Sequence, residues 1–153
     1  MADEHDLPLN EPISTLQKME VLLRTDFFSN VGTQELLLLA DQAVETKWEA
    51  GESLYEEGEL AADFVCIISG SVTLTQDSKL IRVAQEHDYV GLRELLQQKP
   101  RIFSAKAETA VTGLKISGAG FWEILEDYPT LCHAIIAGLA TQIDLLTEKI
   151  AAI

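Results

Sequence analysis

Hydrophobic positions recur at helical spacing near both ends of the chain and alternate with polar positions between them. From Ile13 to Arg24 the apolar residues follow mostly helical steps, which predicts a first helix that ends before Phe27. Thr33 is a candidate N-cap for a second helix that runs to about Gln42. The N-terminal part of the chain is therefore expected to hold two helices.

Beyond residue 43 the helical repeat gives way to alternation, which is typical of half-buried strands. Short segments centred on glycine or aspartate separate the alternating runs and predict tight turns. Hairpins that close into a sandwich or barrel are the simplest arrangement of such strands. The runs are Val44 to Trp48, Phe64 to Ile68, Val72 to Leu74, Leu80 to Ala84 and Phe103 to Ala107, and the turns centre on Gly51, Gly58, Gly70 and Asp77.

Helical spacing returns after Ser117, where a helix is expected to start, and Pro129 is expected to begin another. The apolar face of this last helix continues from Leu131 to Ile150 at steps of three and four residues. That face is longer than a helix needs in order to cover one end of a barrel. The order of helices, many short strands and helices predicts an α+β protein that is mainly β.

The amino-acid composition indicates which kinds of binding partner the chain is expected to have. The chain has 153 residues, of which 47% are hydrophobic, so one domain can bury a core without metal or disulfide support. Its formal net charge of −14 repels nucleic acid and anionic membrane surfaces. Residues 1–12 are acidic and contain proline, which predicts a flexible leader. The sequence has no run of about 18 apolar residues, so it does not predict a membrane-spanning helix. Neither nucleic acid nor direct membrane contact is expected.

Candidate catalytic and metal-binding residues do not form a cluster in the sequence. Cys66 and Cys132 show no CxxC spacing, so both are expected to be reduced thiols of a cytoplasmic protein. His5, His87 and His133 fall in the leader, a turn and the last helix, which leaves no metal-ligand set. No serine lies in a nucleophile elbow. We therefore expect no enzyme activity, no metal and no cofactor.

The stretch from His87 to Arg101 carries the most specific signal. A glycine, Gly91, opens a short helical segment, and the pair Pro100-Arg101 closes it. The spacing resembles the phosphate-binding cassette of the cyclic nucleotide-binding domain family, as in catabolite activators and protein kinase regulatory subunits. A helix N-terminus and one arginine can together hold an anionic phosphate.

The resemblance extends over about residues 13 to 150. The segments from Gly51 to Glu59 and from Phe64 to Val72 resemble the first strands of the family. The resemblance implies an antiparallel β jelly-roll flanked by N- and C-terminal α-helices. It implies N-terminal helices in residues 13–42, a β-roll in 43–116 with the cassette at 87–104, and C-terminal helices in 117–153.

The cassette departs from the family at three positions. Where the family has a glutamate that accepts the ribose 2′-hydroxyl, this chain has Leu92, and an unpaired ribose hydroxyl costs roughly 1–3 kcal/mol of binding. Ile102 and Phe103 replace small residues. Glu94 is an alternative acceptor, although residues two apart do not share a helix face. The candidate ligand-binding residues are Gly91, Leu92, Arg93, Glu94, Pro100, Arg101, Ile102, Phe103 and Ser104.

Two functions remain open at this point. One is a non-catalytic regulatory module that senses cyclic AMP, cyclic GMP or another small anion and shifts its C-terminal helices, passing the change to an effector domain. The other is a degenerate domain that binds no cyclic nucleotide and acts as an interaction scaffold or as a homodimer through the C-terminal helix. Leu92, Ile102 and Phe103 favour the second.

Overall fold

The computed structural model describes residues 11–152, so the predicted leader lies almost wholly outside the described residues. Helix α1 (Thr15–Arg24) starts at Ser14, whose hydroxyl accepts from the backbone N–H of Gln17 while the Gln17 side chain accepts from the Ser14 N–H. This reciprocal capping satisfies two N–H groups that the first turn leaves unpaired. The first helix is therefore confirmed, with a start two residues later than the hydrophobic pattern begins.

Helix α2 (Thr33–Gln42) lies beside α1, after a 3₁₀ turn at Asp26–Phe28 that buries two phenylalanines. The prediction that Thr33 caps this helix is wrong. The extended Gly32 is the N-cap, because its carbonyl accepts the first helical bond, from Leu36 N–H at 2.9 Å. Glycine is tolerated there because the N-cap residue has non-helical dihedral angles.

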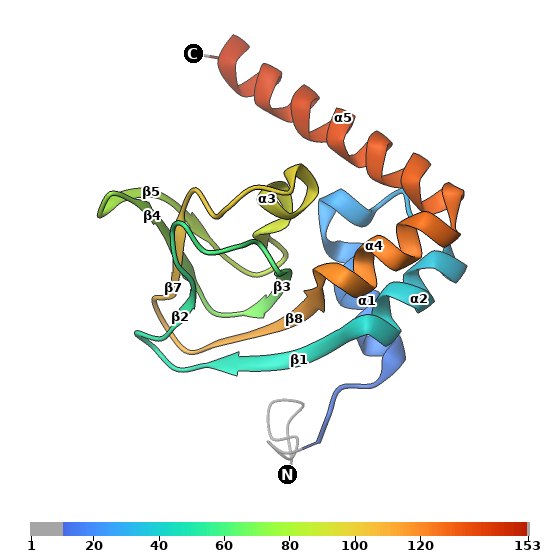
Figure 1. Cartoon of the computed structure of the whole chain (residues 1–153), viewed down its shortest axis with the longest axis horizontal. Helices are drawn as coiled ribbons and strands as arrows, with labels where there is room; N and C mark the ends of the chain where they lie inside the picture. Colours follow the sequence, from blue (N-terminus) through green and yellow to red (C-terminus); the bar gives the residue numbers. More distant parts are fainter. Residues whose placement is uncertain (1–10, 153) are drawn as a thin grey trace.

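Within residues 11–152, eight antiparallel strands form two four-stranded sheets, which confirms the jelly-roll (Figure 1). The sheets follow the orders β1-β8-β3-β6 and β2-β7-β4-β5. The C-terminal strand β8 lies between β1 and β3, so the roll closes before the chain enters its last helices. The strands are β1 (Ala43–Trp48), β2 (Ser53–Tyr55), β3 (Asp63–Ser69), β4 (Val72–Gln76), β5 (Lys79–Ala84), β6 (Tyr89–Val90), β7 (Ser104–Ala107) and β8 (Val111–Ser117).

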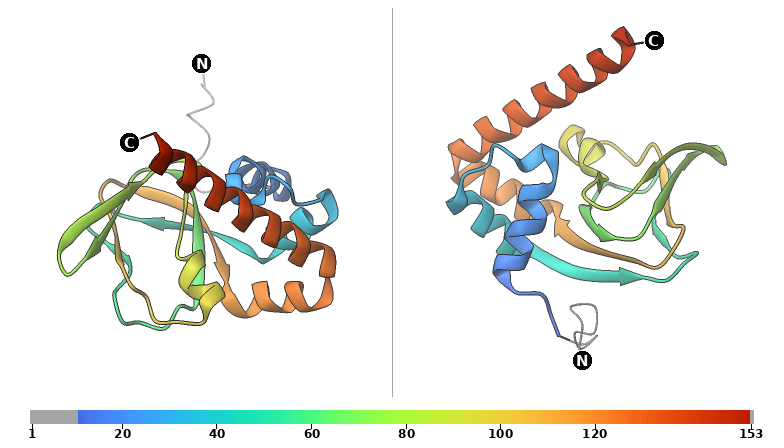
Figure 2. Two further views of the ribbon diagram at one scale, coloured as in Figure 1. Left: turned by 90° about the horizontal axis from the view of Figure 1, so that it is seen from above. Right: turned by 180° about the vertical axis from the view of Figure 1, so that it is seen from behind.

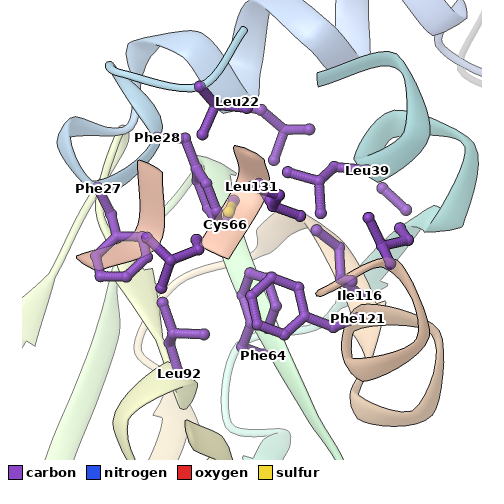
Figure 3. Close-up of a cluster of buried hydrophobic side chains, with 14 of the residues drawn as sticks. Leu22, Phe27, Phe28, Leu39, Phe64, Cys66, Leu92, Ile116, Phe121 and Leu131 are labelled. Atoms are coloured by element: carbon purple, nitrogen blue, oxygen red, sulfur yellow. The ribbon is translucent and has the colours of Figure 1, made fainter. Parts of the chain in front are cut away.

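Strand β3 separates two hydrophobic clusters. Phe64 and Cys66 face a cluster built mainly with the helices, which we call the helical core (Figure 3). Val65 and Ile67 face a cluster enclosed by the two sheets, which we call the roll core. Because successive side chains of a strand point to opposite faces, one strand supplies both cores. This is why β3 is apolar over nearly its whole length rather than alternating with polar residues.

The glycine and aspartate turns form as predicted, and Gly70 shows why glycine is needed. Its φ is +95°, and a Cβ there would lie 2.3 Å from the carbonyl oxygen of Ala110. The β4–β5 turn uses Asp77 and Ser78, both at positive φ. Two positive φ angles at the centre of a two-residue hairpin match the twist of its strands.

The C-terminal helices are α4 (Gly118–Asp127), capped by the Ser117 hydroxyl, and α5 (Pro129–Ala151). Helix α5 crosses the body at its start and then projects beyond the helical bundle (Figure 2). Gly138 packs against the backbone of Phe27, where a Cβ would meet the Phe27 carbonyl oxygen at 2.5 Å. The absence of a side chain at Gly138 therefore lets α5 lie directly against the 3₁₀ turn.

The single apolar face predicted for the last helix divides into two. One face packs on the domain through Leu131, Ile135 and Gly138. The other stays exposed and comprises Ile136, Leu139, Ile143, Leu146 and Ile150. By length and composition alone, α5 is also apolar enough to cross a membrane, and only 22% of its most apolar part is buried in the domain. One such helix is weak evidence for a membrane span.

Candidate functional site

The cassette consists of the short helix α3 (Leu92–Gln97) between two residues in the left-handed conformation. Gly91, at φ +88°, turns the chain from β6 into the helix. Gln98, at φ 56°, ends the helix, and the Lys99 N–H donates to the Glu94 carbonyl at 3.0 Å. Pro100 then makes an isolated bridge to Leu60. The chain is thus led directly to Arg101.

Arg101 is buried, with 3% of its surface exposed, and its guanidinium is bonded within the protein. Nη1 donates to the Gly91 carbonyl oxygen at 2.6 Å. Nη2 donates to the carbonyl oxygen of Asp63 at 2.5 Å and to its carboxylate Oδ1 at 3.2 Å. The Arg101 backbone pairs with Gly58 and Glu59 at 2.8 Å each. One side chain therefore joins the start of α3 to the start of β3.

Tyr55 and Lys115 complete the surroundings of this arginine. The Arg101 guanidinium carbon lies 4.0 Å from the centroid of the Tyr55 ring, a cation–π geometry. The Lys115 ammonium lies 3.4 Å from the second carboxylate oxygen of Asp63. Burial raises the pKa of the Tyr55 hydroxyl, and the negative charge of Glu94 is the second cause. The tyrosine therefore stays neutral.

Leu92 lies in the helical core, beside Phe64 and Phe121 in Figure 3, with 1% of its surface exposed. Its side chain thus packs away from the roll core. Glu94 is two residues further along α3 and is 3% exposed. Successive helical residues are about 100° apart, so Glu94 points to the side opposite Leu92. The two residues do not share a face, as the sequence predicted.

The other candidate residues lie at the rim of the roll. Phe103 is half-buried against the roll core, and the guanidinium carbon of Arg93 lies 5.4 Å from its ring centroid. Ile102 is 38% exposed. The Ser104 hydroxyl accepts from the Glu57 N–H at 3.0 Å and so braces a turn. Phe103 is therefore the bulky residue that packs against the roll core.

The structure has two surface hollows of about 420 Å³ each, and of the candidate residues only Ser104 lines one of them. One is between α3 and α4, lined by Leu60, Leu95 and Trp122 among others. The other is on the outer face of β4 and β7, lined by Thr73 and Lys106 among others. Neither is lined by Gly91 or Arg101. Within the described residues 11–152, no group of three or more histidine, cysteine or acidic side chains is placed to hold a metal ion.

Sequence reasoning missed the partners of Arg101. Asp63 opens an apolar strand, and Tyr55 ends a three-residue strand, so neither belongs to a motif. They lie 38 and 46 residues before the arginine along the chain. Only the pairing of the strands brings them together, and no local pattern signals it.

Comparison with known proteins gives consistent results. The family model described as the cyclic nucleotide-binding domain matches residues 45–128. A cGMP-dependent protein kinase of Toxoplasma gondii is 26% identical over 82% of this chain, which spans 13% of that kinase. A candidate cyclic nucleotide-binding protein of Ruegeria pomeroyi superposes with a TM-score of 0.79 at 20% identity, covering 92% of this chain and 65% of that one.

A further solved structure is the regulatory subunit of a cAMP-independent protein kinase A from Trypanosoma brucei. It has a TM-score of 0.70 and 24% identity, covering 84% of this chain and 47% of that subunit. The TM-scores show that the fold is shared. At sequence identities this low, the two structures do not indicate which ligand this chain binds.

Proposed function

Because this chain belongs to the cyclic nucleotide-binding domain family, we propose that it is a non-catalytic regulatory module whose cassette is closed by Arg101 itself. The observation that carries this proposal is the bonding of Arg101 to Gly91 and Asp63. In this arrangement a phosphate that paired with both terminal nitrogens of the guanidinium would have to displace those oxygens. We expect cyclic AMP and cyclic GMP to bind at millimolar strength or not at all.

Two further features support weak binding. Leu92 offers no acceptor for a ribose hydroxyl, which costs roughly 1–3 kcal/mol, or about one to two powers of ten in affinity. Phe103 packs a bulky ring against the roll core where the family has a small residue. The Trypanosoma brucei regulatory subunit, which belongs to a kinase described as cAMP-independent, has the same fold. This fold is therefore compatible with a regulatory role that does not depend on cyclic AMP.

Calorimetric titration of the whole chain with cyclic AMP and with cyclic GMP tests the proposal. We expect no saturable heat below 1 mM ligand, an order-of-magnitude limit set by the missing contacts. An Arg101→Lys variant keeps the charge and removes the planar fork. Micromolar binding by the natural chain that this variant loses would overturn the closed cassette and establish a working nucleotide sensor.

The output of such a module would pass through α4 and α5 to an effector domain. The chain spans 13% of the Toxoplasma gondii kinase, so the existence and the activity of an effector domain are themselves proposed.

We also propose that the protein is cytoplasmic. This location is supported by Cys66 and Cys132, which form no disulfide.

A second candidate function is dimerisation through α5, favoured by its exposed apolar stripe. Ile136, Ile143 and Ile150 recur every seven residues, with Leu139 and Leu146 between them, and all five are at least 42% exposed. Isoleucine at the first apolar heptad position and leucine at the second favour parallel two-stranded coiled coils. We propose a second copy of this chain as the partner of the stripe.

Sedimentation velocity tests the dimer. An Ile143→Lys variant places a charge in the stripe and should sediment as a monomer, whereas Ala137→Lys adds the same charge at an exposed position of α5 outside the stripe. A natural chain that stays monomeric at high micromolar concentration would refute the pairing. An equal loss of dimer in both variants would show that charge, and not the stripe, controls association.

A further inference from the structure

Glu94 is a buried carboxylate that the function proposed above leaves unexplained. It is 3% exposed, and its Oε1 is fully buried without a hydrogen-bond partner. The Nε of Arg101 is buried and unpaired as well. Unsatisfied polar atoms are uncommon in protein interiors, and those that occur call for an explanation. The cassette thus contains one buried acceptor, Glu94 Oε1, and one buried donor, Arg101 Nε, that make no hydrogen bond.

The direction of Glu94 follows from its place on α3. Leu92 and Leu95 pack into the helical core, so Glu94, about 200° round the helix from Leu92, faces the roll. Its charge raises the pKa of Tyr55, a roll-core residue, more than the adjacent Arg101 lowers it. The neighbouring Arg93 is exposed, so Glu94 alone brings a charge from this helix into the roll.

The charged side chains around Arg101 balance without any ligand, although the Lys115 side chain is 44% exposed. Arg101 and Lys115 carry two positive charges, and Asp63 and Glu94 carry two negative charges. In the described part of the chain, no ion pair within 4.0 Å joins Glu94 to a cation. The negative charge of Glu94 is therefore not neutralised by a single neighbour and acts on any ligand that enters the cassette. An arriving phosphate would add a third negative charge where charges are poorly screened.

We propose that Glu94 determines the charge of the ligand that this cassette accepts and that it excludes phosphate esters. The inference rests on the proposed function, since it explains why anions are rejected. It adds a named residue to that function. Leu92 removes one contact with a nucleotide, whereas Glu94 repels its phosphate.

Removing the charge tests the inference. Glu94→Gln keeps the shape of the side chain, and Glu126→Gln removes the same charge from the exposed surface of α4 as a matched control. In calorimetric titrations with cyclic AMP and with inorganic phosphate, we expect Glu94→Gln to bind about tenfold more tightly or better than the natural chain. Glu126→Gln should bind as the natural chain does. Adding Arg101→Lys to Glu94→Gln should remove the gain, which would locate it at the cassette.

Thermal unfolding gives a second measure. Glu94→Gln should raise the melting temperature, because a buried charge without a partner destabilises the folded state. Equal affinities for the natural chain and Glu94→Gln would overturn the inference and leave the closed cassette standing. Micromolar cyclic AMP binding by the natural chain that Glu94→Gln loses would overturn both, and would make Glu94 the acceptor of the ribose hydroxyl.

Discussion

Replacing Gly91 by alanine should break the contact that holds the cassette closed, and Gly51→Ala is its matched control. Both glycines have positive φ angles, +88° at Gly91 and +93° at Gly51. A Cβ on Gly91 would lie 2.7 Å from Nη1 of Arg101, whereas a Cβ on Gly51 would have no atom within 4 Å. The difference between the two variants therefore isolates the arginine contact from backbone strain.

The structure sets the expected magnitudes. A side chain at positive φ costs about 1 kcal/mol, and this is the whole expected effect of Gly51→Ala. In Gly91→Ala the guanidinium must move as well, which breaks its hydrogen bond to the Gly91 carbonyl oxygen, 2.6 Å away. Losing that charge-assisted bond adds about 1.5–3 kcal/mol. The total for Gly91→Ala is about 2.5–4 kcal/mol.

Urea denaturation followed by tryptophan fluorescence measures both variants on the same scale. Unchanged slopes with lowered midpoints would show that stability has changed and not the surface exposed on unfolding. The melting temperature should fall by about 5–15 °C for Gly91→Ala and about 2–4 °C for Gly51→Ala. Equal losses in the two variants would refute the idea that Arg101 braces the cassette through Gly91.

Three further predictions concern the core and the pH dependence of stability. Leu92→Glu, which restores the family residue, should lower stability by about 3 kcal/mol or more in urea denaturation and gain no nucleotide affinity, because the position faces the helical core. Burial raises the pKa of Cys66 to about 12 from an ordinary value of 9.0, so alkylation near pH 8 should label Cys132 alone, and stability should fall as pH rises from about 9 toward 12. The hydrogen bond from Thr130 lowers the pKa of Glu35, so its contribution to stability should be lost as pH falls below about 4.5, and Thr130→Ala should raise that pKa in an NMR titration.

Much of the architecture could be predicted from the sequence because its signals are local. Positive-φ turn positions favour glycine or aspartate, as at Gly70 and Asp77, and the change of hydrophobic period marks where helices give way to strands. The N-cap of α2 was misassigned because Thr33 is the usual residue type for a cap, while the extended backbone of Gly32 is visible only in three dimensions.

The sequence predicts which residues form the candidate site, but it does not predict which partners their side chains contact. The spacing from Gly91 to Arg101 places both residues in the cassette, and the structure brings them to 2.6 Å. Whether the arginine faces outward or inward depends on Asp63 and Tyr55, which are distant in sequence and reach it only through strand pairing. The two faces of α3 followed from helix geometry, but which face meets the roll depends on how the whole helix is seated.

The double role of β3 limits how this domain can move. Shifting the strand by one residue would carry Phe64 and Cys66 into the roll and Val65 and Ile67 into the helices, mismatching the shapes of both clusters at once. The shortest slide that keeps each side chain on its own face is two residues, which would break the bridge between Asp63 and Arg101. We therefore expect β3 to keep its register in any conformational change of this domain, and other elements such as α4 and α5 to move relative to it.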